Sequence, residues 1–236
     1  MEIEVISTYQ DINKLKIKDK VVVAIDTFRA TSTIITALNY NIKRIYPVED
    51  IKEAKKFIKD KSYIVAGERD GKKIADFDLG NSPLSYKSNL FTAKKLVLTT
   101  TNGTKLLKKL IGADNIYIAS LLNQAAIATL LSQQQKDIIF CCAGNRGEFS
   151  LEDFLTAGAI ITKLKIEKDD ILSDKAIAAR EIYIAQKNNL NTFLKDTASG
   201  KNLINLGKEA DIDFIVAKRI DLVPYYANNK IEEFSN

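Results

Sequence analysis

The chain has 236 residues, 46% apolar and 28% charged, a composition that is ordinary for a globular protein with a substantial core. Its net charge is +5, but the lysines are spread along helix-like faces without a block of like charges, so we expect solvated surface and no nucleic-acid partner. The sequence contains no histidine, which excludes phosphohistidine enzymes, Ser-His triads and histidine-rich metal sites.

The beginning of the chain and its cysteines indicate a cytoplasmic protein with no membrane partner. Met-Glu-Ile-Glu lacks the basic region and apolar run of a signal peptide, and no apolar stretch reaches the roughly 18 residues needed to span a bilayer. The two cysteines, Cys141 and Cys142, are neighbours at the end of an apolar run, so they point to opposite faces of a strand and form no mutual disulfide. We expect both in the core, and a homodimer is the default expectation for the oligomeric state.

Short β-rich runs alternate with helical patterns through the first two-thirds of the sequence. The run 21–25 is apolar on both faces, as in a central strand. In chain order we expect a strand at 21–25, a helix at 30–39, a strand at 44–48, a helix at 50–59 capped by Asp50, a strand at 63–66, a long functional loop at 67–90 with at most one short strand, a strand at 96–99, a helix at 103–110, a strand at 116–119, a helix at 123–132, a strand at 137–142 and a helix at 150–163.

The last third of the sequence is predominantly helical. Ser173 is expected to cap a helix that runs to Lys187, short helices follow at 191–195 and 200–206, and a last strand is expected at 221–225. No linker rich in Pro, Gly or Ser separates this part, so we expect residues 1–236 to form a single domain. The predicted fold class is α/β, with a layered, mixed and largely parallel sheet flanked by helices and a helical C-terminal portion.

A polar segment follows the first predicted strand. Asp26 ends that strand, and Thr31, Ser32 and Thr33 begin the next helix, where free backbone N–H groups and hydroxyls can hold a phosphate or sulfonate. Arg29 adds a planar set of donors for oxyanion oxygens. In open α/β sheets ligands bind at the carboxyl ends of the strands. The alternative is that Asp26 and Thr31 only cap the helix.

A second polar turn has the same arrangement. Asn102 and Gly103 permit a turn with positive φ, and Thr104 places a hydroxyl at the start of the next helix. This segment is predicted to bind substrate. An ordinary strand-to-helix turn is the alternative.

A third polar turn follows the predicted strand at 137–142. Its glycines, Gly147 among them, let the backbone approach a ligand, while Asn145 and Arg146 supply an amide and a charge. Glu148 adds a carboxylate, and a capping box at 150–153 opens the next helix.

Several carboxylates are candidates for holding a magnesium ion. Mg²⁺ takes oxygen ligands and keeps several waters, so one to three carboxylates are enough. The long loop contributes Glu68, and the candidate ligands are Asp26, Glu68, Glu148 and Asp153.

Other phosphate-handling mechanisms do not fit. A cysteine phosphatase needs an arginine six residues after its nucleophile, but Gly147 and Glu148 stand at that distance from Cys141 and Cys142. The Asp-x-Asp pattern of haloacid-dehalogenase phosphatases fails because Phe28 follows Asp26 two residues on, and no Gly-Lys-Ser/Thr of a P-loop occurs.

Taken together, these segments resemble the 2-phosphosulfolactate phosphatase family, and the resemblance runs in order from about residue 21 to 224. It is carried by the segments 25–34, 67–69, 77–83, 100–104, 143–153 and 199–203, with Gly207, Asp211 and Pro224. Lys201 stands where the family pattern has an arginine, and Thr27 where a more apolar residue is usual.

The resemblance implies a magnesium-dependent hydrolysis of 2-phosphosulfolactate, or of a similar small anionic phosphate ester, to sulfolactate and phosphate. Asp26, Arg29 and Arg146 are then the expected catalytic residues, with attack on phosphorus either by a water or by Asp26 itself. Arg69 and Lys201 join the expected substrate-binding residues Thr31, Ser32, Thr33, Asn102, Gly103, Thr104, Asn145 and Gly147. The alternatives are a non-hydrolytic binder of anionic metabolites or nucleic acid, and a phosphoryl transferase using the same site.

Overall fold

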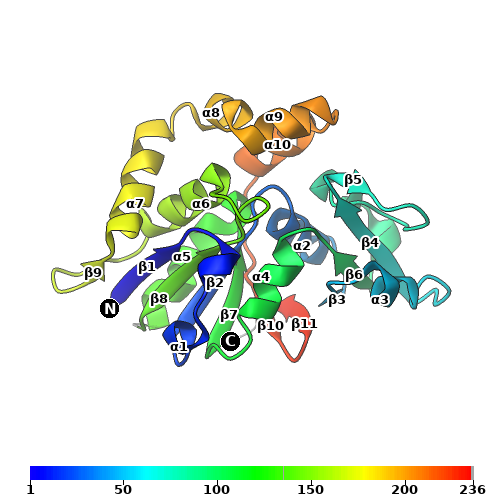
Figure 1. Ribbon diagram of the computed structural model, residues 1–236, viewed down its shortest axis with the longest axis horizontal. Helices are drawn as coiled ribbons and strands as arrows, with labels where there is room; N and C mark the ends of the chain where they lie inside the picture. Colours follow the sequence, from blue (N-terminus) through cyan, green and yellow to red (C-terminus); the bar gives the residue numbers. More distant parts are fainter. Residues whose placement is uncertain (135, 235–236) are drawn as a thin grey trace.

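The computed structural model describes residues 1–134 and 136–234, and the strands among them form one sheet (Figure 1). In order across the sheet they are β5 (Lys72–Lys73), β4 (Tyr63–Arg69), β6 (Lys95–Thr99), β3 (Arg44–Pro47), β11 (Lys230–Glu233), β10 (Pro224–Ala227), β7 (Asn115–Ala119), β2 (Val21–Ile25), β8 (Ile138–Cys142), β1 (Glu2–Ile6) and β9 (Ile171–Leu172).

The sheet consists of two parallel groups joined by an antiparallel hairpin, with the short β5 antiparallel to β4 at one edge. Strands β7, β2, β8, β1 and β9 pair in parallel, and so do β3, β6 and β4. The hairpin β10–β11 lies between the groups, and across the ladder Tyr225 pairs with Tyr117 of one group and Ile231 with Ile45 of the other. A largely parallel, mixed sheet is therefore confirmed.

Helices cover both faces of the sheet because the central strands are apolar on both. In β2, Val22 and Ala24 join one core cluster, while Val21, Val23 and Ile25 join the other, as the alternation of side chains along a strand requires. The first cluster includes α2 (Ala30–Asn39) and α4 (Gly103–Lys109), and the second includes α5 (Gln124–Gln134), α6 (Leu151–Ile161) and α7 (Asp174–Gln186). The short helices α1 (Lys14–Ile17) and α3 (Ile51–Lys55) each bury one residue, Ile17 in the first cluster and Ala54 in a smaller cluster with Val65 and Val97.

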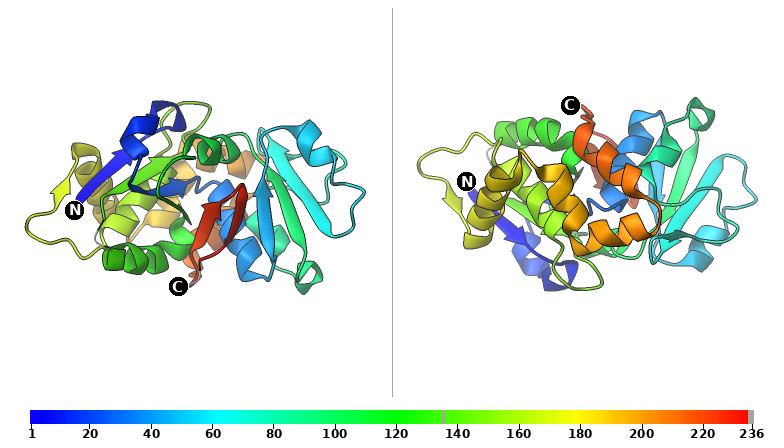
Figure 2. Two further views of the ribbon diagram at one scale, coloured as in Figure 1. Left: turned by 90° about the horizontal axis from the view of Figure 1, so that it is seen from below. Right: turned by 90° about the horizontal axis from the view of Figure 1, so that it is seen from above.

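Three C-terminal helices gather beyond one end of the sheet, at the top of Figure 1 and facing the viewer in the right panel of Figure 2. They are α8 (Leu190–Asp196), α9 (Ala198–Asn205) and α10 (Glu209–Ala217). Leu194, Leu203 and Ile212 of these helices pack against Leu121, which follows β7, and Leu155 of α6, and this packing anchors the group to the rest of the fold. A helical C-terminal portion is thus confirmed.

Parts of the element prediction were wrong. The expected strand at 221–225 is instead a hairpin inserted in the middle of the sheet, and the helix expected at 50–59 ends at Lys55, although Asp50 caps it by accepting from Lys52 N at 2.8 Å. Strand β4 runs on to Arg69, into the expected loop. Strands β1 and β9 and helices α1 and α10 were not foreseen.

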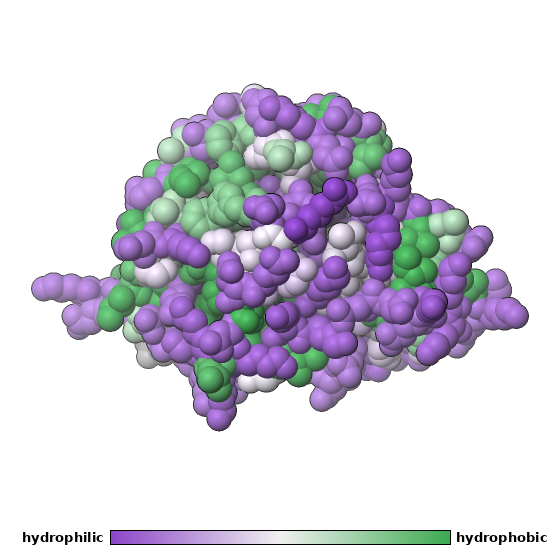
Figure 3. All heavy atoms as spheres, viewed as in Figure 1, coloured by the Kyte–Doolittle hydropathy of each residue, from purple (hydrophilic) through white to green (hydrophobic). Residues whose placement is uncertain are grey.

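Both cysteines are buried free thiols, as expected. None of the described helices combines the length and the apolar character that crossing a bilayer would require. The face seen in Figure 3 is mainly hydrophilic.

Candidate active site

Strand-end turns, the segment that contains Asn81, the first turn of α6 and helix α9 enclose a polar cavity of about 420 Å³. The turns follow β2, β4, β6 and β8. The three polar turns picked out in the sequence thus lie around one cavity at the carboxyl ends of their strands, where open α/β sheets bind ligands. The lining residues include Asp26, Arg29, Glu68, Asn81, Asn102, Asn145, Arg146, Glu148, Glu152, Asp153, Ser199 and Asn202.

Asp26 occupies the turn between β2 and α2 and is almost fully buried. One of its carboxylate oxygens, Oδ1, accepts from Ala30 N at 3.2 Å. The Thr31 hydroxyl accepts from Asp26 N at 3.1 Å and donates to Asp26 O at 2.8 Å. Burial, helped by the nearby charges of Glu68 and Glu152, raises the pKa of Asp26 to about 7. A carboxyl group with such a pKa can exchange a proton near neutral pH.

Asp153 joins the ends of two strands. Its Oδ1 accepts from Thr27 N at 2.7 Å and its Oδ2 from Gly144 N at 3.2 Å, so it connects the turns after β2 and β8. The N-cap of its helix, Ser150, accepts from Asp153 N at 3.4 Å. Burial raises the pKa of Asp153 well above its usual range, with Glu152 adding to the effect through repulsion.

Glu152 is a lining carboxylate that the sequence analysis did not assign to the site. It is buried beside Asp153 in the first turn of α6, and burial raises its pKa. The capping box at 150–153 placed two acidic residues in this turn. This pattern could have pointed to Glu152, because residues in a first helical turn lie close to whatever faces the helix N-terminus.

Glu68, at the end of β4, holds two turns together. Its Oε1 accepts from Thr101 N at 2.7 Å, and its Oε2 accepts from Gly71 N at 2.8 Å and from the Thr101 hydroxyl at 3.2 Å. The carboxylate therefore fixes the β6–α4 turn against the β4–β5 turn while it lines the cavity.

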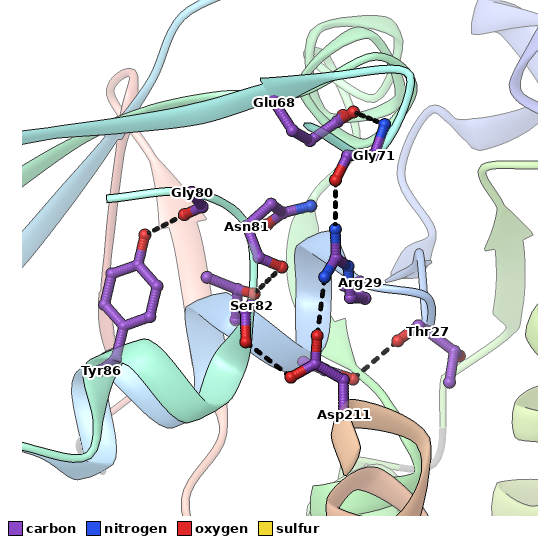
Figure 4. Close-up of polar contacts among 11 residues, drawn as sticks. Thr27, Arg29, Glu68, Gly71, Gly80, Asn81, Ser82, Tyr86 and Asp211 are labelled. Carbon is purple, nitrogen blue, oxygen red and sulfur yellow. Dashed lines mark hydrogen bonds and ion pairs between the residues drawn. The ribbon is translucent and has the colours of Figure 1, made fainter. Parts of the chain in front are cut away.

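Arg29 is a buried cation held in a fixed orientation (Figure 4). One guanidinium nitrogen donates to Asp211 Oδ2 at 2.6 Å and the other to Gly71 O at 2.9 Å. Asp211, on α10, also accepts from the Ser82 hydroxyl at 2.6 Å. Since a guanidinium carries five N–H donors, Arg29 retains donors for a ligand in the cavity that it lines. The sequence analysis included Asp211 in the family pattern but gave it no role.

The rim of the cavity is more exposed. Arg146 donates to Asp70 at 2.6 Å, and Asn145 donates to the Ser199 hydroxyl at 3.3 Å. Glu148 is exposed at the same rim. These three predicted residues therefore line the cavity mouth from the turn after β8.

The predicted substrate-binding hydroxyls are engaged with backbone in this structure. The Ser32 hydroxyl donates to Thr27 O at 2.8 Å and the Thr104 hydroxyl to Thr100 O at 3.0 Å; Thr33 donates to Asn81 O at 3.0 Å. Like the Thr31 hydroxyl, they hold the turns that shape the cavity. Gly103 serves packing, since a Cβ there would lie 2.5 Å from the Ala30 Cβ.

Three other predicted residues lie outside the lining. The Arg69 guanidinium donates to the backbone oxygens of Glu68 and Glu49, and Lys201 is exposed with its ammonium 3.8 Å from Asp196. Gly147 allows a positive φ of 89° beside the cavity. Their roles in substrate binding stay predictions, because none of the three residues lines the cavity in this structure.

The donor set suits a hard divalent cation. Four buried carboxylates line the cavity, and repulsion among them contributes to the raised pKa of Asp26 and of Asp153. Among the described residues no three acidic, histidine or cysteine side chains converge closely enough to form a complete metal site. One or two carboxylates with several waters is a coordination that Mg²⁺ commonly adopts, so the residues fit this ion.

Comparison with known proteins decides the family. The model of the family described as 2-phosphosulpholactate phosphatase matches residues 6–229. The chain belongs to the 2-phosphosulfolactate phosphatase family. Proteins named probable 2-phosphosulfolactate phosphatase from Clostridium tetani and Clostridium novyi are each 41% identical to it, over 98% of this chain and 100% and 99% of theirs. One from Caldanaerobacter subterraneus is 41% identical over 97% of this chain and 96% of its own.

This finding confirms the resemblance seen in the sequence and the class of phosphoric monoester hydrolases. The match begins at the end of β1 and ends beyond β10, so it includes every turn that lines the cavity.

Proposed function

We propose that the protein is a magnesium-dependent phosphatase that hydrolyses 2-phosphosulfolactate, or a similar small anionic phosphate ester, to sulfolactate and phosphate. The observation that carries this proposal is the convergence of four buried carboxylates and a buried arginine on one polar cavity. The family and the names of the relatives favour hydrolysis over non-hydrolytic binding.

Asp26 is the residue that acts on the nucleophile. Its carboxylate lines the cavity and can act as a general base that takes a proton from an attacking water. The hydrogen bond from Ala30 N to Oδ1 fixes the carboxylate and leaves its other oxygen without a backbone donor. That oxygen can therefore orient the water.

Arg29 stabilises the transferring phosphoryl group. Its guanidinium is held by Asp211 and Gly71 before any ligand binds, so little reorganisation accompanies the charge that develops on the phosphoryl oxygens. Arg146, at the rim, meets an outer anionic group of the substrate. When bound, Mg²⁺ neutralises charge on the phosphate oxygens, and Asp26, Glu68, Glu152 and Asp153 are the carboxylates that would hold it.

The remaining properties follow from the same observations. The lining residues span positions 26 to 203, so we propose that the chain works as one catalytic unit. Two buried free thiols suit a reducing cytoplasm, which we propose as the compartment. A homodimer stays the default hypothesis.

The test is phosphate release from 2-phosphosulfolactate, 2-phospholactate and phosphoglycolate, each with magnesium and with EDTA. We expect magnesium-dependent release that is strongest with the sulfonated ester. Release from the other esters alone would support a phosphatase that acts on a different substrate. No release from any ester would support a non-hydrolytic binder.

Asp26→Asn tests the role of the central carboxylate. We expect a fall in kcat of about 10²–10⁴-fold because the base is removed while the shape is kept. Asp50→Asn is the matched control, since Asp50 caps α3 away from the cavity and asparagine caps equally well. A folded Asp26→Asn variant with normal turnover would refute the assignment.

A further inference from the structure

Asn81 presents a buried amide without a partner at the wall of the cavity. Its side chain is 5% exposed, it lines the cavity, and its Oδ1 makes no hydrogen bond with the described residues. Buried polar atoms in native proteins are almost always hydrogen-bonded, and an unsatisfied one carries its full desolvation penalty. A partner that arrives with the ligand would remove this penalty.

The backbone around Asn81 is held firmly, which fixes the position of this residue in the wall of the cavity. Each residue from 79 to 82 makes a hydrogen bond to a different element, and Figure 4 shows those of Gly80 and Ser82. The bonds are Gly67 N to Leu79 O at 3.2 Å, Tyr86 Oη to Gly80 O at 2.8 Å, Thr33 Oγ1 to Asn81 O at 3.0 Å and Ser82 Oγ to Asp211 Oδ1 at 2.6 Å.

The same scaffold positions Asn81 and Arg29. Asp211 accepts from Ser82, the neighbour of Asn81, and from the Arg29 guanidinium at 2.6 Å each. Figure 4 shows the Asn81 amide on the side of Arg29 and Gly71, and all three line the cavity. A cation and a neutral amide are thus fixed side by side, facing the same space.

We propose that Asn81 binds the ligand: its Nδ2 donates to an oxyanion oxygen that the Arg29 guanidinium also contacts, and its Oδ1 accepts from a water or hydroxyl that accompanies that group. The inference rests on the proposed function and adds a specificity-determining residue to it. An amide donor recognises an anionic oxygen without placing a second positive charge beside the acidic wall.

The experiment compares Asn81→Leu, Asn81→Asp and the control Asn123→Leu. Asn123 is also a buried asparagine, but its amide is satisfied: it accepts from Ser120 N and donates to Ile118 O and Leu222 O, away from the cavity. The thermal stability of each variant is measured with saturating magnesium, alone and with inorganic phosphate or sulfolactate. Turnover and KM for the ester are measured in parallel.

Asn81→Leu is expected to leave the stability of the free protein unchanged or raised, because no hydrogen bond is lost. The variant should bind phosphate or sulfolactate, and the ester, roughly 10- to 100-fold more weakly. Whichever product loses affinity identifies the oxyanion that the amide contacts. Asn81→Asp removes both donors and adds a repelling charge, so its affinity should fall at least as far. Asn123→Leu should lose stability and keep the affinity of wild type.

Two results would overturn the inference and leave the proposed function intact, provided that the wild-type protein turns over the ester. The first is an Asn81→Leu variant with unchanged affinity, and the second is an Asn81→Asp variant with retained affinity. A loss of free-protein stability in Asn81→Leu with normal affinity would show a structural amide and overturn it as well. A wild-type protein that releases no phosphate and is stabilised by neither product would overturn both the inference and the proposed function.

Discussion

Two arginine–aspartate pairs of equal length differ in almost every other respect. Arg29 and Asp211 lie 2.6 Å apart with side chains 3% and 1% exposed, whereas Arg146 and Asp70 lie 2.6 Å apart with side chains 70% and 69% exposed. The first pair is part of the wall of the cavity and the second crosses its rim. Distance alone therefore says little about what an ion pair contributes, because burial decides how strongly its charges interact.

The comparison separates a prearranged wall from an adaptable rim. In the wall, Asp211 and Gly71 O engage two nitrogens of Arg29, so this cation is held in one orientation and its remaining donors serve the cavity. At the rim, Arg146 is open to solvent and can exchange Asp70 for an anionic ligand at small cost. The wall is thus suited to chemistry, and the rim to the capture of substrate.

Breaking the buried pair should have the largest effect. Asp211→Ala leaves the Arg29 guanidinium buried without its counter-charge and the Ser82 hydroxyl without its acceptor. We expect the free energy of unfolding to fall by about 3–5 kcal/mol and kcat to fall with it, as Arg29 loses its orientation. Chemical denaturation and phosphate release measure the two effects.

Asp70→Ala is the matched control for this prediction, because it breaks a pair of the same length at the rim. The free energy of unfolding of Asp70→Ala should fall by less than about 1 kcal/mol. The double variant Arg29→Met/Asp211→Leu should be more stable than Asp211→Ala, since no buried charge remains unpaired. Equal losses in Asp211→Ala and Asp70→Ala would contradict the distinction between wall and rim.

The local parts of this architecture could be predicted from the sequence, and the distant pairings could not. The turns after β2, β6 and β8 follow from short apolar runs that end in polar residues. By contrast, Arg29 and Asp211 are 182 residues apart, and no local pattern links them. The hairpin β10–β11 likewise gains its place between β3 and β7 only from pairing across the chain.

A second limit concerns hydroxyl groups at helix starts. A threonine or serine there can bond either its own turn or a ligand, and the sequence is the same in both cases. In this structure Thr31 and Ser32 bond the turn. Asn81 is the opposite case, a residue to which the sequence analysis gave no role although it lies in the segment at 77–83. It stands out only in the structure, where its buried Oδ1 has no hydrogen-bond partner among the described residues.

The carboxylates of the wall should give stability an unusual dependence on pH. Because the folded-state pKa of Asp26 is raised to about 7, the folded protein binds more protons than the unfolded chain between about pH 4 and 7. The stability that this group contributes is therefore fully present below about pH 4 and is lost as the pH rises through 7. From pH 5 to 8 the loss is on the order of 2 kcal/mol.

The measurement is the free energy of unfolding of wild type and Asp26→Asn in EDTA at pH 5 and pH 8. Asp26→Asn should gain stability relative to wild type at pH 8, and magnesium should reduce this gain by stabilising wild type. Groups with lowered pKa values, such as Asp137 and Asp213, affect both proteins equally. A difference that does not change with pH would show that Asp26 does not titrate in this range.

Changes at the rim should have the smallest effects. Arg146→Ala removes an exposed charge, so we expect little change in stability or kcat and a rise in KM of about three- to tenfold. The rise should shrink in high salt, because screening weakens an exposed cation's attraction for an anionic ester. Lys136→Ala, which removes an exposed, ion-paired charge outside the cavity lining, is the matched control and should change KM less than twofold. A fall of 100-fold in kcat for Arg146→Ala, insensitive to salt, would move Arg146 from the rim to the catalytic group that the sequence predicted, and it would show that the loop after β8 closes onto the wall when substrate binds.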